Sequence, residues 1–86
     1  MDYYPIQTTA QLSVHIKSLR KAKGLSQTQL GQLMGLGQVR IADIEKSPGR
    51  ISVDQLVKIL QILETRLVLQ PITNQSATAD KHKQEW

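Results

Sequence analysis

The chain contains no cysteine and only two histidines among its 86 residues. Disulfide bonds and thiolate metal sites are therefore excluded, and nothing points to an oxidising compartment. The two histidines, His15 and His82, lie far apart in the sequence without evident ligand residues near them, so we expect no metal and no cofactor. A chain of this length has room for one modest domain.

Long apolar runs are also missing. No segment stays apolar over the roughly 20 residues that a membrane-spanning helix needs, and the N-terminal sequence MDYYPIQTT lacks the basic-then-apolar pattern of a secretion signal. We therefore expect a cytoplasmic protein without a membrane contact. The sequence shows neither a nucleophile–base pair with an orienting group nor a phosphate-binding glycine loop, so we expect no enzyme and no catalytic residues.

What the sequence does carry is an excess of positive charge, with 11 Lys and Arg against 7 Asp and Glu for a net charge of +4. Residues 71–86 hold two charges of each sign, so the whole excess lies in residues 1–70. A basic folded region suits a polyanion such as nucleic acid. A merely soluble surface is the alternative, and charge alone does not decide between them.

Residues 27–46, QTQLGQLMGLGQVRIADIEK, have the pattern of two short helices joined by a tight turn. Ser26 and Gln29 have the spacing of a capping box at the start of the first helix, and Gly35 suits the left-handed position that ends it. The apolar positions are Leu30, Leu33 and Met34 in the first helix and Val39, Ile41 and Ile44 in the second. Such a pair is a helix-turn-helix, which places its second helix where it can enter a DNA major groove.

Two further helices are predicted around this pair. Thr8 or Thr9 can cap a helix that runs to about Lys23, and Ser52 can cap another that follows the breaker-rich loop at 46–50. Their apolar faces are formed by Leu12, Ile16 and Leu19 in the first and by Val53, Leu56, Ile59, Leu60 and Leu63 in the last. We therefore expect residues 1–7 to be an N-terminal extension and residues 8–64 to be the mainly α-helical domain.

Residues 65–71, TRLVLQP, predict a short strand that contains Arg66, Leu67, Val68 and Leu69. A lone strand leaves backbone donors and acceptors unmatched, and the chain offers no second convincing strand. The favoured remedy is the same strand from a second copy, which would make a homodimer with an intermolecular sheet. Two alternatives are pairing with residues 3–6 and an extended segment packed on its own helices.

The last segment, residues 72–86, is polar until its final residue. It holds too little apolar material to offset the entropy of ordering, so we expect it to be disordered in the free protein. Trp86 has no core to occupy there and is suited to anchor a partner protein. An unremarkable terminus is the alternative.

Residues 20–45 resemble the XRE/Cro family of phage-repressor-type helix-turn-helix proteins. The matching positions are Arg20, Gly24–Gln27 (GLSQ), Leu30, Gly31, Gly35, Gln38, Ile41, Ile44 and Glu45. The resemblance implies a lambda-repressor-like bundle of about five helices, of which this chain supplies four and then the strand. It also implies that Gln27 touches a phosphate and supports Gln38 at the start of the third helix, and that Arg20 and Glu45 form an inward, structural salt bridge.

The chemistry of the side chains agrees with DNA contact. An amide offers a donor and an acceptor to an adenine edge at Gln38, and Arg40 can bind a guanine or a phosphate. Val39 can meet a thymine methyl, whereas Asp43 is an unfavourable neighbour for DNA. The residues expected to contact DNA are Ser26, Gln27, Thr28, Gln38, Val39, Arg40, Lys46, Ser47 and Arg50.

The helix-turn-helix is followed by the stretch LVKILQILE (Leu56–Glu64), the short strand and a polar tail that ends in Glu85 and Trp86. In this order of elements, over nearly its whole length, the chain is similar to the HipB-type antitoxins of this family. That resemblance implies a dimeric, nucleoid-associated repressor that binds palindromic double-stranded DNA operators in its own promoter. It also implies capture of a HipA-like serine/threonine-kinase toxin, with Trp86 reaching that partner. A phage-type or restriction–modification control repressor without a toxin, and an interaction module that does not read DNA, are the competing interpretations.

Overall fold

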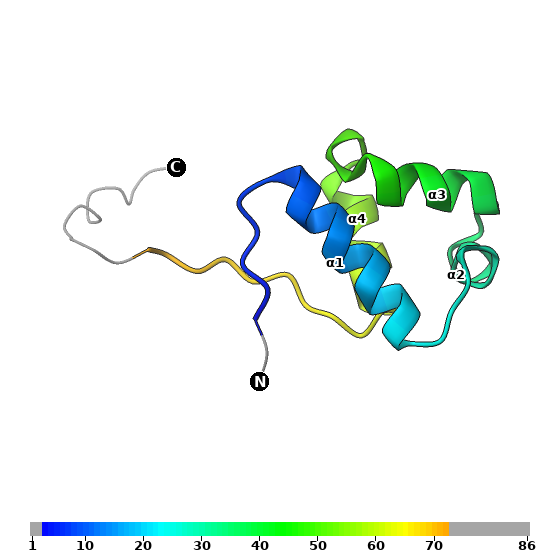
Figure 1. Cartoon of the computed structure of the whole chain (residues 1–86), viewed down its shortest axis with the longest axis horizontal. Coiled ribbons are helices and arrows are strands. Elements are labelled where there is room, and N and C mark those ends of the chain that lie inside the picture. Colours follow the sequence, from blue (N-terminus) through cyan, green and yellow to red (C-terminus); the bar gives the residue numbers. More distant parts are fainter. Residues whose placement is uncertain (1–2, 73–86) are drawn as a thin grey trace.

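Four α-helices make up most of residues 3–72, the part of the chain that the computed structural model describes. In chain order the elements are α1 (Thr9–Ala22), α2 (Gln27–Met34), α3 (Gln38–Lys46), the 3₁₀ turn η1 (Pro48–Arg50) and α4 (Val53–Ile62). Figure 1 shows α2 and α3 at one end of the bundle, with α1 in front of α4. The prediction of a mainly helical helix-turn-helix fold is confirmed.

The helices begin and end where the local sequence directs them. At α1 and α2 the cap hydroxyls of Thr8 and Ser26 accept a backbone N–H three residues ahead, and the glutamine there bonds back to the cap. These two capping boxes satisfy N–H groups that a helix start otherwise leaves free. Gly35 ends α2 with φ of 72°, in the left-handed region where glycine carries no steric penalty.

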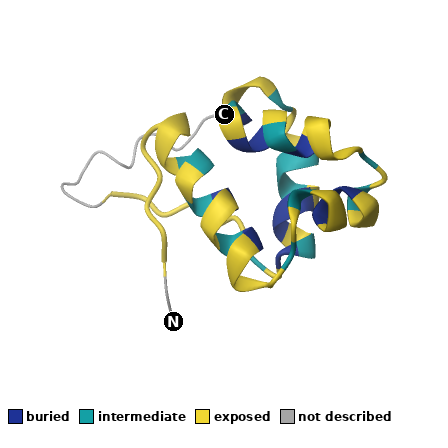
Figure 2. Cartoon of the chain, turned by 45° about the vertical axis from the view of Figure 1, so that its right-hand side comes forward, coloured by how far each residue is buried: buried dark blue, intermediate teal, exposed yellow. Residues whose placement is uncertain are grey.

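The core consists of seven buried apolar side chains drawn from all four α-helices and the residue after α4. They are Ile16, Leu30, Ile41, Ile44, Ile59, Leu60 and Leu63. Figure 2 shows the buried residues on the facing sides of the helices and the exposed residues outside. The amphipathic spacing read from the sequence therefore matches the face that each helix turns inward.

Gly31 allows α2 to lie unusually close to the turn that leads into α3. A Cβ atom built on Gly31 would stand 2.5 Å from the carbonyl oxygen of Leu36 and 3.3 Å from Cγ1 of Ile41. Neither is an ordinary van der Waals contact, so a larger residue would push α2 away from α3. This close approach sets the geometry of the helix pair.

Two apolar residues predicted to face the core are exposed instead. Leu33 is 60% exposed and Val53 is 68% exposed. In the two-turn helix α2, Leu30 and Gly31 already occupy the face that meets the core, and Leu33 lies at its edge. Val53 is the first residue of α4, a full turn ahead of the part that packs inward.

After α4 the chain turns at Glu64, whose φ of 56° is left-handed, and leaves the bundle as an extended segment over residues 66–72. Within the described part of the chain this segment makes no backbone hydrogen bond and no ladder with residues 3–6. Arg66, Leu67, Val68 and Leu69 are all exposed, so the bundle leaves these side chains largely uncovered. Pairing between two copies involves a second chain and stays a prediction.

The expectations about the C-terminal tail and about membrane-spanning helices depend on which residues the structure describes. Trp86 and the rest of the tail from residue 73 lie outside them. Within residues 3–72, no helix has both the length and the apolar character to cross a bilayer.

Candidate nucleic-acid interface

A buried ion pair joins the first helix to the third. Arg20 of α1 donates from Nε to Oε2 of Glu45 at 2.5 Å and from Nη2 to Oε1 at 3.3 Å. Glu45, on the last turn of α3, is 1% exposed and Arg20 is 7% exposed. The third guanidinium nitrogen, Nη1, donates to the carbonyl of Leu25 at 2.8 Å, so the guanidinium also holds the loop before α2.

A line of side-chain hydrogen bonds runs from this ion pair to the surface. Oε1 of Glu45 also accepts from Nε2 of Gln27, the first residue of α2, at 3.1 Å. Oε1 of Gln27 in turn accepts from Nε2 of Gln38, the first residue of α3, at 2.6 Å. Gln27 is half-buried and Gln38 is exposed. The starts of both helices of the pair are therefore coupled to the same buried carboxylate.

The outer face of α3 presents a short row of exposed side chains next to Gln38. Val39 is 77% exposed, and Arg40 and Asp43 are exposed as well. Val39 thus takes no part in the core, which leaves its methyl groups free for a partner. This face combines an amide, an apolar group and a guanidinium, the three chemistries that read base edges in a major groove.

Gln55 of α4 holds Arg40 and is a residue that sequence reasoning missed. Nη2 of Arg40 donates to Oε1 of Gln55 at 3.0 Å. Gln55 lies three residues after Ser52, and its backbone N–H bonds to that cap hydroxyl. The sequence spacing favours a capping box there, as at α1 and α2. The side chain accepts from Arg40 instead, a contact between residues 15 positions apart that the sequence pattern does not show.

The remaining predicted contact residues lie at two places around α3. Ser26 and Thr28 are at the start of α2, where the Ser26 hydroxyl is already engaged by the N–H of Gln29. Lys46 is the last residue of α3, and Ser47 and Arg50 follow that helix; both cations are exposed. Among residues 3–72, neither Arg40, Lys46 nor Arg50 has a carboxylate within ion-pair distance, so these cations remain available to an anion.

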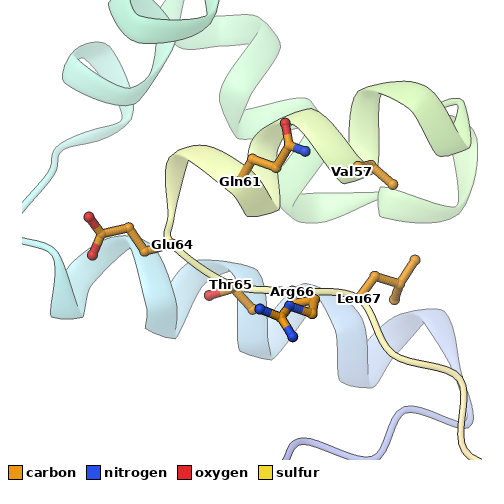
Figure 3. A pocket seen from close by; sticks show the side chains of 6 residues that line it. All are labelled: Val57, Gln61, Glu64, Thr65, Arg66 and Leu67. Atoms are coloured by element: carbon orange, nitrogen blue, oxygen red, sulfur yellow. The ribbon is translucent and has the colours of Figure 1, made fainter.

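A concave surface lies between α4 and the segment that follows it (Figure 3). It is an open groove of about 490 Å³ lined by Val57, Gln61, Glu64, Thr65, Arg66 and Leu67. Glu64 is paired with Lys23 at 2.6 Å, and the hydrogen bond and charge of that lysine hold the pKa of Glu64 below its usual value. In the described part of the chain no cluster of His, Cys, Asp or Glu is suited to a metal.

Comparisons with known proteins identify what this arrangement resembles. A family described as "Helix-turn-helix" matches residues 16–69. The antitoxin HipB of Escherichia coli O6:H1 (strain CFT073) is 31% identical over 87 residues, which cover 100% of this chain and 93% of that protein. The antitoxin HipB of Escherichia coli (strain K12) is 29% identical, with coverages of 100% and 99%.

Solved structures give the same relatives. A structure described as a HipB–O1–O2 complex superposes with a TM-score of 0.71 at 29% identity and covers 80% of this chain and 100% of that one. A HipB–O4 20mer complex gives the same TM-score and identity, with coverages of 80% and 97%.

Replacing Glu45 by alanine should lower the free energy of unfolding by about 3 kcal/mol, because the Arg20 guanidinium would stay buried without its partner. The matched control is Asp43→Ala in the same helix, which removes an exposed carboxylate and should change stability by less than about 0.5 kcal/mol. Thermal and urea unfolding followed by circular dichroism measure both. Equal melting temperatures of the two variants would contradict the expected cost of leaving the Arg20 charge buried and unpaired.

Proposed function

Because the chain belongs to the helix-turn-helix family and, within it, to the HipB-type antitoxins, we propose that it is a sequence-specific DNA-binding repressor that serves as an antitoxin. This is not an enzyme family, which confirms the expectation drawn from the sequence. The observation that carries the proposal is the exposed amide of Gln38, held by Gln27 at the start of α3. We propose that it binds operator DNA in the cytoplasm.

In this proposal α3 lies in the major groove and its exposed row reads base edges. The Gln38 carbonyl and its remaining N–H bond bidentately to an adenine, whose major-groove edge offers one donor and one acceptor. Arg40 bonds to a guanine or to a phosphate nearby, starting from a position fixed by Gln55. Val39 covers a thymine methyl. Each contact uses a group that the fold already holds at the surface.

Contacts to the phosphate backbone set the register of α3 in the groove. The first N–H groups of α2, at Gln27 and Thr28, have no intrahelical acceptor and point outward with the positive end of the helix dipole. Such a helix start binds a phosphate. At the C-terminal end of α3 and just beyond it, Lys46, Ser47 and Arg50 contact the opposite stretch of DNA backbone. These contacts add affinity and salt dependence but no sequence information.

Joint replacement of Gln38 and Arg40 by alanine should abolish discrimination between the operator upstream of the protein's own gene and a scrambled duplex. Each bidentate contact is worth about 1–3 kcal/mol, so the affinity ratio should fall at least about 30-fold. Fluorescence anisotropy at several salt concentrations measures it. The control Lys46→Ala should weaken both duplexes alike and make the salt dependence shallower by about one charge. A double variant that still discriminates would refute the proposed reading helix.

We propose that the repressor acts as a dimer paired through residues 65–71. The backbone groups of residues 66–72 find no partner within the described chain, and Leu69 is 89% exposed. An antiparallel pair of these segments would satisfy the backbone groups that face the second strand and would bring the leucine and valine side chains of the two copies together. A two-fold dimer also presents two α3 helices to the two halves of a palindromic operator.

The variant Val68→Pro should be monomeric, because proline removes a backbone donor and restricts the strand geometry. Val68 is 54% exposed and lies beyond the bundle, so the helical circular dichroism should stay unchanged. Val68→Ala keeps the backbone N–H and should remain largely dimeric. Sedimentation equilibrium compares the three proteins, and a Val68→Pro variant that sediments as a full dimer would count against the pairing.

We further propose that the protein neutralises a HipA-like serine/threonine-kinase toxin through its tail. Support comes from the match to HipB antitoxins over the full chain and from the apolar Trp86 at the end of a polar segment. A phage-type or restriction–modification control repressor would share the DNA interface but have no such partner. A kinase gene next to this one would favour the antitoxin.

Deletion of residues 80–86 should abolish co-purification with the kinase toxin and leave operator affinity within about twofold of the full chain, since the tail lies outside the helix-turn-helix and carries no net charge. The point variant Trp86→Ala should weaken toxin capture in the same direction. Affinity pull-down from cells that co-express both proteins measures capture. Undiminished capture by the deletion variant, with DNA binding intact, would show that the anchor lies elsewhere.

A further inference from the structure

We propose that Glu45 is a positioning residue for base recognition. Through its hydrogen bond to Gln27, the carboxylate determines whether the nitrogen or the oxygen of the Gln38 amide is turned toward Gln27. It thereby fixes the order in which the Gln38 donor and acceptor meet the edge of the DNA base. This inference rests on the proposed contact between Gln38 and an adenine. It assigns to a buried side chain, one that never touches DNA, a share in the base preference.

The argument begins with the donor and acceptor inventory of the three groups. A carboxylate paired with a guanidinium can only accept hydrogen bonds. Gln27, which lies 3.1 Å from Oε1 of Glu45, must therefore turn its NH₂ group toward that oxygen. Its carbonyl oxygen then points the other way, toward Gln38, at 2.6 Å from the amide nitrogen. Gln38 must therefore turn its NH₂ group toward that carbonyl oxygen and donate to it.

The order of nitrogen and oxygen in both amides thus follows from the charge of Glu45. With its nitrogen held on the side of Gln27, Gln38 leaves one N–H and its carbonyl for the base, in a fixed order. An adenine offers an acceptor at N7 and a donor at N6, and it pairs with only one order of the amide atoms. A reversed amide at the same position would set donor against donor and acceptor against acceptor.

Glu45 is well suited to this task because it cannot rotate. Both of its oxygens accept from Arg20, and Arg20 is itself held by the Leu25 carbonyl. The Ser13 hydroxyl of α1 donates to the backbone carbonyl of Glu45 and ties down the same turn of α3. With Glu45 1% exposed, water does not compete for the first bond of the line. Hydrogen bonds in such surroundings strengthen one another along a chain.

The direct test is Glu45→Gln, which preserves size and shape and gives one end of the group a donor. Both ends face a donor of Arg20, but Nε lies 2.5 Å from Oε2 whereas Nη2 lies 3.3 Å from Oε1. The carbonyl therefore keeps the shorter bond to Nε, and the new NH₂ group takes the end that faces Gln27. Gln27 and Gln38 must then both reverse. The matched control is Arg20→Lys, which weakens the ion pair and the fold but leaves the carboxylate facing Gln27.

The readout is binding to four operators that carry each base pair in turn at the position read by Gln38, identified as the one where Gln38→Ala removes the preference. Wild type should prefer its best base at least about tenfold over the others. Glu45→Gln should reduce that preference below about threefold, whereas Arg20→Lys should keep it within about twofold of wild type. A purely structural role for Glu45 would instead weaken all four operators in parallel. Circular dichroism confirms that each variant is folded at the assay temperature.

A second variant leaves Arg20 and Glu45 unchanged and tests the same proposal if Glu45→Gln does not fold. Gln27→Lys can bond to Glu45 but offers Gln38 a donor in place of an acceptor, so the base preference should again fall. In a Gln27→Ala background, Glu45→Gln should have no additional effect on preference, because the connection between them is gone.

The outcomes separate the two proposals. If Gln38→Ala removes the preference while both Glu45→Gln and Gln27→Lys retain it, the positioning role is overturned and the DNA-reading function stands. If Gln38→Ala leaves the preference at every operator position unchanged, the proposed base contact itself fails.

Discussion

The ion pair between Arg20 and Glu45 is the interaction on which the rest of this structure depends. It joins α1 to the end of α3 across the core, and both partners are nearly inaccessible to water. Burying two charges has a desolvation cost that their attraction roughly offsets, so such a pair fixes orientation more than it adds stability. Here the orientation is that of α3, the helix whose exposed face carries the candidate DNA contacts.

Two close contacts carry that orientation to the surface. Gly31 lets α2 approach the turn before α3 more closely than any other residue would permit. The line from Glu45 through Gln27 to Gln38 then locks the starts of both helices to one carboxylate. The pair α2 and α3 is thus held at the core by the ion pair between Arg20 and Glu45 and at the surface by the side-chain amides of Gln27 and Gln38. A rigid platform of this kind reduces the entropy that binding must overcome.

Several features of the fold could be predicted because they depend on neighbours in the sequence. The caps at Thr8 and Ser26, the left-handed Gly35 and the spacing of Leu12, Ile16 and Leu19 within α1 are local signals, and the helix limits follow them. Leu33 and Val53 were misplaced because periodicity marks an apolar face but not how far the neighbouring helix extends over it. That extent depends on packing between elements.

The sequence by itself determined the four helices, the tight turn and the family to which they belong, since each is written in residues a few positions apart. Tertiary structure decided how side chains from different helices meet: Gln55 beside Arg40, and Gln27 between Glu45 and Gln38. These partners are separated by 15, 18 and 11 positions in the chain. Their contacts exist only once the core has set the angles between helices, because a hydrogen bond requires its atoms within about 3 Å and a sequence pattern specifies no distance across the fold.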